Sequence, residues 1–277
     1  QMKENEKKYL RSDIEPAKTI ILAAGDHGKE LSIKILLEDL PATMLDINGK
    51  SILQRNIETL NQMGLQNIIV VRGFKKEKIN IEGVRYIDND DYAETHILHS
   101  LFYAKEELEG RIILSYSDIL YDSEIVTRLL SQTDDIVLVI DRLHRLDQVH
   151  SVKLDLVVAE KDPIDSKRVV TINRPNPVIR IGKNIPLDHA NYEFVGLALF
   201  SEKGVKVLKE VYEEVKKDYK GRPFHEADNF QSASLTDILQ EIINRGYRVS
   251  TLEVYKGWIE VHTFEDYKTA CHLYSHT

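Results

Sequence analysis

Cysteine, long apolar runs and excess positive charge are all scarce in this chain. Cys271 is the only cysteine among 277 residues, so no internal disulfide can form, which fits a protein of the reducing cytosol. No apolar run approaches the roughly 20 residues of a membrane span, and the polar N-terminus does not have the form of a signal peptide. These absences predict a cytoplasmic protein without a membrane partner.

The charge balance is acidic, with a formal net charge of -8. That balance argues against a broad basic surface for nucleic acid, while a local basic pocket for a phosphorylated ligand stays compatible with it. Hydrophobic residues make up 42% and charged residues 30% of the chain, as in ordinary globular proteins. The Walker, GxGxxG and HExxH patterns are all missing, so the sequence predicts neither of those phosphate loops and no zinc site of that type.

Apolar runs alternate with helical patterns through the first half of the chain. Residues 1–17 are predicted to be an N-terminal lead-in or linker that ends near Pro16, and residues 18–277 to form one domain. Strand–helix alternation predicts an α/β fold with a doubly wound, mostly parallel sheet, whose ligands bind beyond the carboxyl ends of the strands. The expected strands are 19–24, 66–73, 83–90, 111–118 and 135–141, and the expected helices 51–64, 97–110 and 123–132.

The second half is richer in strand patterns. Four of them follow one another without a long helix between them, and they predict a mixed or antiparallel β-rich extension. Amphipathic helices and one further strand complete the domain. The four strand patterns are 152–160, 168–172, 177–185 and 192–200, the helices are 202–219, 234–247 and 263–274, and the further strand is 248–255.

A glycine turn follows the first buried strand, in "TIILAAGDHGKEL". Glycine permits close approach and positive φ, so the backbone N–H groups of this turn can converge on anionic phosphate oxygens. The alternative is a tight strand-to-helix turn without a ligand. The residues expected to contact the nucleotide phosphates are Leu22, Ala23, Ala24, Gly25, Asp26, His27 and Gly28.

Five motifs in order resemble one enzyme family. "ILAAG…G…L" is followed by "LP" and "MLDINGKSIL", then by "DNDDYAETHILHSLFYAKEEL", "SYSDIL" and "GWIEVHTFEDY". This series resembles the nucleotidyltransferases that activate sugar phosphates, phosphocholine and phosphonates. "VVRGFKKE" and "SASLTDILQ" are most similar to the cytidylyltransferase domains fused to phosphoenolpyruvate mutase in phosphonate biosynthesis. The resemblance spans residues 19–270 and implies a Rossmann-like, glycosyltransferase-A-like fold with a β-rich acceptor-site extension.

The resemblance implies a reaction as well as a fold. A phosphate or phosphonate oxygen of a small acceptor would attack the α-phosphorus of CTP, with Mg²⁺ as cofactor, and pyrophosphate would leave. Two alternatives stay open: a sugar-1-phosphate nucleotidyltransferase that uses UTP or dTTP, and a nucleotide-binding domain with weakened or lost catalysis. A homodimer and a fusion to an upstream enzyme domain also stay open.

Carboxylates at two places are candidate metal ligands. Asp118 ends a buried strand, and by resemblance it is the aspartate of the family's metal strand. The family often has aspartate where His262 stands. Glu260 lies two residues earlier, so both side chains face the same side of a strand. We expect Glu260 to share the metal with Asp118, and His262 to contact the metal, a phosphate or water. A turn aspartate and an exposed strand end are the structural alternatives.

A lysine that the family carries is missing from the proline-led segment. Ala42 follows Pro41 where most relatives have lysine, and losing one preorganised donor at a developing oxyanion costs about 2.7–4 kcal/mol. Either another cation then substitutes, or the domain is a weak or inactive catalyst. Lys29 in the glycine turn is the predicted catalytic substitute, with Lys34 and Lys50 as further candidates.

Base and acceptor contacts are predicted on two other segments. The stretch "YAETHILHS" is expected over the nucleotide, where Thr95 has helix capping as its alternative, and His96 is a candidate phosphate donor. The strand "ANYEFVGLALF" resembles the lining of the acceptor site, where a cationic amine would suit Tyr192 and Glu193. The base or ribose contacts are Glu94, Thr95 and Ser100, and Ser117 is a further nucleotide contact; the acceptor contacts are Arg180, Tyr192 and Glu193, with Lys183 beside them.

Overall fold

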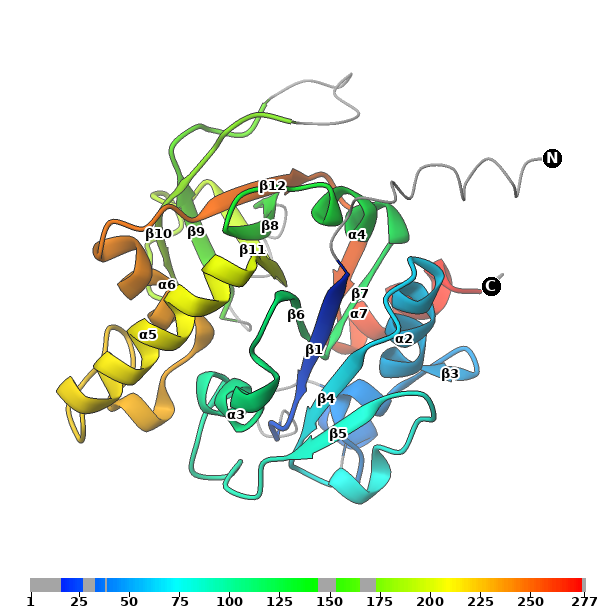
Figure 1. Cartoon of the computed structure of the whole chain (residues 1–277). Coiled ribbons are helices and arrows are strands. Elements are labelled where there is room, and N and C mark those ends of the chain that lie inside the picture. Colours follow the sequence, from blue (N-terminus) through cyan, green and yellow to red (C-terminus); the bar gives the residue numbers. More distant parts are fainter. Residues whose placement is uncertain (1–15, 27–32, 38, 144–152, 165–172, 276–277) are drawn as a thin grey trace.

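The computed structural model describes residues 16–26, 33–37, 39–143, 153–164 and 173–275. Its main sheet has the strand order β10-β9-β11-β6-β1-β4-β5, with β8 pairing with both β11 and β12. Figure 1 shows this sheet with helices on both sides. The strands are β1 (Ala17–Ala23), β4 (Ile68–Arg72), β5 (Arg85–Asp88), β6 (Arg111–Tyr116), β8 (Ile136–Arg142), β9 (Leu156–Ala159), β10 (Val178–Gly182), β11 (Tyr192–Phe200) and β12 (Ser250–Val254).

Two small ribbons and the helices complete the fold. The ribbons are β13 (Trp258–Glu260) with β7 (Ile119–Tyr121), and β2 (Asp46–Ile47) with β3 (Lys50–Ser51). The α-helices are α2 (Ile52–Gln62), α3 (Ile97–Tyr103), α4 (Ser123–Leu130), α5 (Glu202–Asp218), α6 (Leu235–Asn244) and α7 (Phe264–Leu273). Short 3₁₀ turns are η3 (Lys34–Leu37), η4 (Ala42–Met44), η5 (Lys76–Lys78), η6 (Lys105–Glu107) and η7 (Phe230–Ser232).

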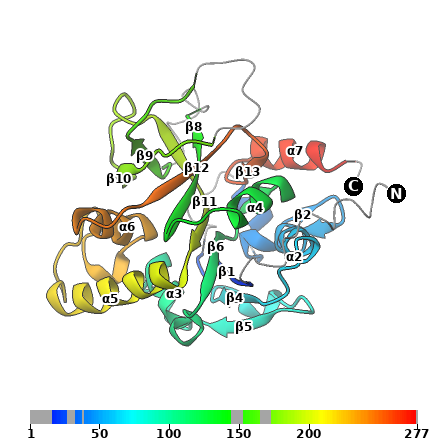
Figure 2. The same ribbon diagram turned by 45° about the horizontal axis from the view of Figure 1, so that its top comes forward.

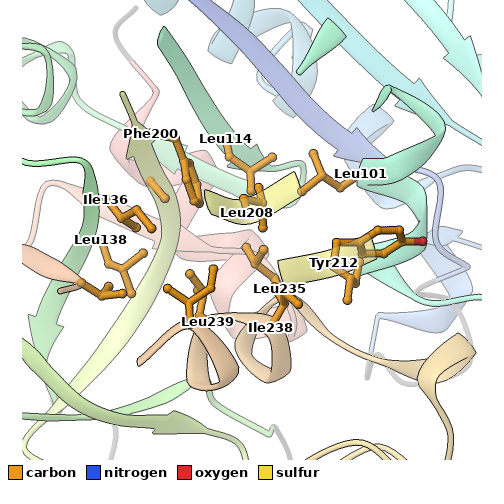
Figure 3. Packing of buried hydrophobic residues seen from close by; sticks show 14 of the residues in the cluster. Leu101, Leu114, Ile136, Leu138, Phe200, Leu208, Tyr212, Leu235, Ile238 and Leu239 are labelled. Carbon is orange, nitrogen blue, oxygen red and sulfur yellow. The ribbon is translucent and has the colours of Figure 1, made fainter. Parts of the chain in front are cut away.

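The predicted doubly wound sheet is confirmed. The strands β5, β4, β1 and β6 run parallel, and apolar side chains from both of their faces are buried under helices. One buried cluster joins the sheet to α3, α5 and α6; the second joins the opposite face to α2 and α4. In Figure 3, Leu208 and Tyr212 of α5 pack with Leu235 and Leu239 of α6.

The β-rich half lies partly within the main sheet. All nine residues of β11 are buried, and the strand runs antiparallel to both β6 and β8. Beyond the end of β6, β11 also pairs with β9, which in turn pairs with the edge strand β10. Figure 2 shows β9 and β10 together beyond one end of β11. This arrangement brings the extension to the level of the carboxyl end of β6. The strand expected at 168–172 lies outside the described residues.

Helix α3 is shorter than its sequence pattern predicts. The helix ends at Tyr103 rather than at Gly110, and the chain continues through η6. Lys18 donates to the main-chain oxygen of Glu107 at 2.9 Å, and Arg85 forms an ion pair with the Glu107 carboxylate at 2.6 Å. These contacts tie the segment to the neighbouring strands β1 and β5. The tertiary contacts therefore override the local helical pattern.

A half-buried histidine makes the stability of this fold depend on pH. His99 of α3 packs edge-on against Phe230, with ring centroids 5.0 Å apart, and burial, assisted by Lys216 and His96, lowers the pKa of its imidazole to about 4. The unfolded chain therefore binds the proton more readily, and stability is expected to fall as the pH drops from about 6.5 to about 4. The full loss from this group is about 3 kcal/mol.

Urea unfolding of wild type and His99→Phe at pH 7 and pH 4 tests this expectation. The His99→Phe variant is expected to lose less stability on acidification than wild type by about 3 kcal/mol. His189 is 64% exposed at its side chain, and His189→Phe serves as the matched control with an unchanged pH profile. Equal acid sensitivity in wild type and His99→Phe would contradict the assignment.

Candidate active site

The carboxyl end of β6 is joined to a distant segment of the chain. Strand β7 directly follows Asp118 and pairs antiparallel with β13, with Glu260 opposite Ile119. The N–H of Val261 donates to the main-chain oxygen of Asp118 at 2.9 Å. This pairing brings Asp118, Glu260 and His262 together, with one ligating atom of each within 4.8 Å of the others. The ribbon thus assembles the three residues that the sequence predicts around a metal.

The three side chains interact strongly. Nε2 of His262 lies 2.5 Å from Oε1 of Glu260 and 3.9 Å from Oδ2 of Asp118. Burial by itself would lower the pKa of His262, but the Glu260 and Asp118 carboxylates outweigh it and raise this pKa to about 9. The position of His262 is fixed because its N–H and that of Thr263 donate to Asp266, in the capping box of α7. The two carboxylates of the cluster therefore stabilise a positive charge placed between them.

The donor set fits a hard divalent cation through its two carboxylates. Mg²⁺ in proteins commonly takes one or two carboxylates and fills its other positions with substrate oxygens and water. Asp118 and Glu260 offer such oxygens at one site. Imidazole is a poorer ligand for Mg²⁺, and His262 already contacts Glu260. His262 therefore fits a position beside the cation better than one bound to it.

The glycine turn starts where β1 ends. Leu22, Ala23 and Ala24 are buried, while Gly25 is exposed. The main-chain oxygen of Ala24 accepts a hydrogen bond from Phe74, which fixes the turn against the end of β4. β1 is the direct neighbour of β6, so this turn and Asp118 share one edge of the sheet. The predicted contacts His27, Gly28 and Lys29 lie outside the described residues. Asp26 is described, and its role in phosphate binding stays a prediction.

Two residues that the sequence did not single out fix the chain segments next to the turn after β1. A Cβ on Gly73 would lie 2.8 Å from the oxygen of Ala24 and 2.9 Å from the oxygen of Asn89, so only glycine allows these chain segments to come this close. The buried amide of Asn89 donates to Ser100 at 3.0 Å and accepts from the N–H of Asp91. Asn89 therefore anchors the segment expected over the nucleotide.

The predicted base contacts occupy different environments. Ser100 is buried and bonded to Asn89, and Ser117 is also buried, whereas Glu94 is exposed. Thr95 does not cap α3: the cap residue is His96, and the Thr95 hydroxyl donates to the oxygen of Asp91. The capping alternative for Thr95 is thus wrong. Its contact with the base stays a prediction.

The predicted acceptor residues do not share one surface. Tyr192 is buried, and its hydroxyl lies in a network with Glu253 at 2.9 Å and with Arg174. Glu193 is buried next to it, whereas Arg180 is exposed on the edge strand β10. The contacts of Tyr192 tie β11 to β12, which gives this residue a structural task.

A different group lies near the cluster of Asp118, Glu260 and His262. Tyr116 donates its hydroxyl to Oδ2 of Asp155 at 2.8 Å, and Nζ of Lys183 lies 3.8 Å from Oδ1 of the same carboxylate. The pKa of Asp155 is raised above its ordinary value, chiefly by burial and further by the nearby carboxylates of Glu260 and Asp118, while Lys183 and the Tyr116 hydroxyl act in the opposite direction. Asp155 therefore lies within electrostatic range of the cluster. No sequence pattern pointed to Tyr116 or Asp155; Lys183 was a candidate for an anionic group.

Ala42 is part of the core. It is 3% exposed and belongs to a cluster with Leu45, Ile259 and Val261, so its side chain packs beneath the strand that carries Glu260. Of the alternative cations, Lys34 is exposed and Lys50 forms an ion pair with Glu58 at 2.7 Å. Position 42 therefore contributes to the packing of the hydrophobic core in this chain.

Restoring lysine at position 42 is expected to destabilise the protein without raising turnover. Ala42→Lys would place an unpaired ammonium in an apolar cluster, and we expect a loss of about 3 kcal/mol in the free energy of unfolding. Urea unfolding measures that loss, with Ala93→Lys as the control because Ala93 is exposed. A fully stable Ala42→Lys variant with at least tenfold faster pyrophosphate release would contradict this packing role.

Comparisons with known proteins identify the family. A family model described as "MobA-like NTP transferase domain" matches residues 19–191. The chain therefore belongs to the MobA-like NTP transferase family. In the described ranges, no helix is both long and apolar enough to cross a membrane.

Individual relatives give a consistent picture. The chain is 24% identical to a CTP:phosphoglutamine cytidylyltransferase of Campylobacter jejuni over 261 residues, which cover 89% of this chain and 96% of that protein. It is 32% identical over 108 residues to a choline-phosphate cytidylyltransferase of Streptococcus pneumoniae, covering 38% and 46%. The solved inositol-1-phosphate CTP transferase of T. maritima has a TM-score of 0.66 at 18% identity, covering 92% and 96%. That structure supports the fold.

Proposed function

We propose that this protein is a cytidylyltransferase that transfers CMP from CTP to a small acceptor with a phosphate or phosphonate group. The observation that carries the proposal is the cluster of Asp118, Glu260 and His262 beside the β1 turn. Relatives named for CTP-dependent transfer to phosphoglutamine and to phosphocholine support the choice of CTP. A bound Mg²⁺ would supply charge neutralisation at phosphate oxygens.

The chain itself contributes position and charge to this reaction. The turn after β1 would bind the triphosphate through main-chain N–H groups. Asp118 and Glu260 would hold the cation, and His262 fixes the Glu260 carboxylate by the 2.5 Å contact. An oxygen of the acceptor forms a bond to the α-phosphorus as the bond from that phosphorus to the bridging oxygen breaks, and pyrophosphate leaves with the electron pair.

Pyrophosphate release tests this proposal. We expect CTP to support turnover with phosphocholine, aminopropylphosphonate or an amino-acid phosphonate, at a kcat/KM at least about tenfold above that with UTP or ATP. Calorimetric titration with each nucleotide in the presence of Mg²⁺ measures binding separately. Tighter binding of UTP than of CTP would overturn the base assignment. Binding of CTP without pyrophosphate release from any acceptor would instead support a nucleotide-binding domain.

A further inference from the structure

Asp155 has an unused hydrogen-bonding atom in a buried position. Its side chain is 9% exposed, and its Oδ1 has no hydrogen-bond partner among the described residues. Oδ2, in contrast, accepts from the Tyr116 hydroxyl. This oxygen is closed to solvent, so a ligand with an N–H donor reaches it only when a neighbouring side chain moves aside. Because a buried carboxylate oxygen without a donor is costly, such a contact would contribute binding energy.

The neighbouring lysine is held in place by the backbone around it. The carboxylate of Glu226 accepts from the N–H groups of Lys183 and Asn184 at 2.7 and 3.0 Å. Glu226 is itself fixed, because its own N–H donates to Asp237 in the capping box of α6. A Cβ on Gly182 would collide with the Glu226 carboxylate at 2.3 Å. These contacts therefore fix the conformation of the turn that places Lys183 near Asp155.

The Asp155–Lys183 pair lies on the acceptor side of the cluster. Tyr116, which binds Asp155, is two residues before Asp118 in the chain. Asp155 precedes β9 and Lys183 follows β10, and both strands lie across β11 from β6, whereas β1 with its glycine turn lies on the opposite side of β6. With the triphosphate at the β1 turn, the pair lies on the side of β6 that is left for the second substrate.

We propose that Asp155 and Lys183 together bind the zwitterionic, amino-acid-type head of the acceptor. The ammonium donates to Oδ1 of Asp155 and the carboxylate contacts Nζ of Lys183. This inference rests on the proposed function, since it names the acceptor class of that same site. A zwitterion suits the pair because an ammonium alone at Oδ1 would be repelled by Lys183, and a carboxylate alone would be repelled by Asp155. With both groups the charges stay balanced.

Three phosphonates with the same carbon spacing test the inference. Phosphonohomoalanine carries both charged groups, aminopropylphosphonate lacks the carboxylate, and phosphonobutyrate lacks the ammonium. Calorimetry measures their affinities for the full chain saturated with Mg²⁺ and a non-cleavable methylene analogue of CTP. We expect phosphonohomoalanine to bind at least about tenfold more tightly than either of the others.

Two variants should change these preferences in opposite ways. Asp155→Asn keeps an acceptor for Tyr116 and is expected to weaken binding of phosphonohomoalanine and aminopropylphosphonate about 10- to 100-fold, with no loss for phosphonobutyrate. Lys183→Met is expected to weaken phosphonohomoalanine and phosphonobutyrate, but not aminopropylphosphonate. Lys203→Met is the control, because it removes an exposed ion pair with Asp135, 3.0 Å apart, at the start of β8 and α5, away from the cluster.

The outcomes separate this inference from the proposed function. If the CTP analogue binds and the three phosphonates have equal affinities, the zwitterion assignment is overturned and the proposed function stands. A uniform loss for all three phosphonates in Asp155→Asn would also overturn it, because a merely structural role predicts that result. If the CTP analogue itself does not bind, the proposed function fails.

Discussion

Asp118→Asn is expected to slow pyrophosphate release from CTP at least about a thousandfold. The substitution replaces a carboxylate oxygen ligand with a weaker neutral amide and leaves one carboxylate at the cluster. Stability should change little, because the contact that joins Asp118 to Val261 uses its main-chain oxygen. Removing the Asp118 charge relieves its repulsion with Glu260 but also removes its attraction to His262, 3.9 Å away, so the two effects oppose each other. Single-turnover assays together with urea unfolding measure both quantities.

The control for this experiment is Asp218→Asn. Asp218 ends helix α5 and is exposed, so the same chemical change there should leave the turnover rate within about twofold of wild type. A turnover rate for Asp118→Asn within tenfold of wild type would remove this carboxylate from the reaction. A large loss of stability in Asp118→Asn would assign the residue a structural role instead.

Gly196→Ala is expected to lower the free energy of unfolding by about 3 kcal/mol and to weaken acceptor binding about tenfold. Gly196 has φ +89°, and a Cβ there would lie 2.5 Å from Cδ2 of Tyr116. It occupies the bulge of β11 between Phe194 and Ala198, which allows the Tyr116 ring to lie directly over the strand. Displacing that ring would disturb its hydrogen bond to Asp155, while the turn after β1 stays in place.

Gly246→Ala isolates the part of this effect that comes from Tyr116. Gly246 also has a positive φ, +85°, but a Cβ there would meet nothing within 4 Å. Its replacement should therefore cost only the conformational strain of about 1 kcal/mol, without change in acceptor affinity. Urea unfolding and calorimetry with aminopropylphosphonate compare the two variants. Equal losses in both would show that the contact with Tyr116 has no energetic weight.

The first half of the fold could be predicted because its strands are buried on both faces. Continuous apolar runs such as "TIILAA" and "RIILSY" have no polar alternation, and they form the parallel strands β1 and β6 that the pattern predicts. Helix caps could be predicted too, because they depend on residues close in sequence: Ser234 forms its capping box with Asp237. The end of α3 could not be predicted, since Glu107 contacts strands far away in sequence.

From the sequence, the candidate site could be located only at the cluster of Asp118, Glu260 and His262. Asp118, Glu260 and His262 stand in motifs with fixed places at strand ends, and one ribbon brings them together. Asp155 has no such motif, because its position depends on the pairing of β9 with β11 and on the glycine bulge beneath Tyr116. The burial of Ala42 also depends on tertiary packing against β13. Register and packing of this kind have no local sequence signal.

Crystals grown with Mn²⁺ and the non-cleavable CTP analogue test the central claim most directly, since the anomalous scattering of Mn²⁺ locates the cation. The account predicts a peak in coordination distance of Asp118 and Glu260 oxygens, with the triphosphate between that peak and the turn that follows β1. A peak at another place, or a triphosphate bound away from both carboxylates, would contradict it.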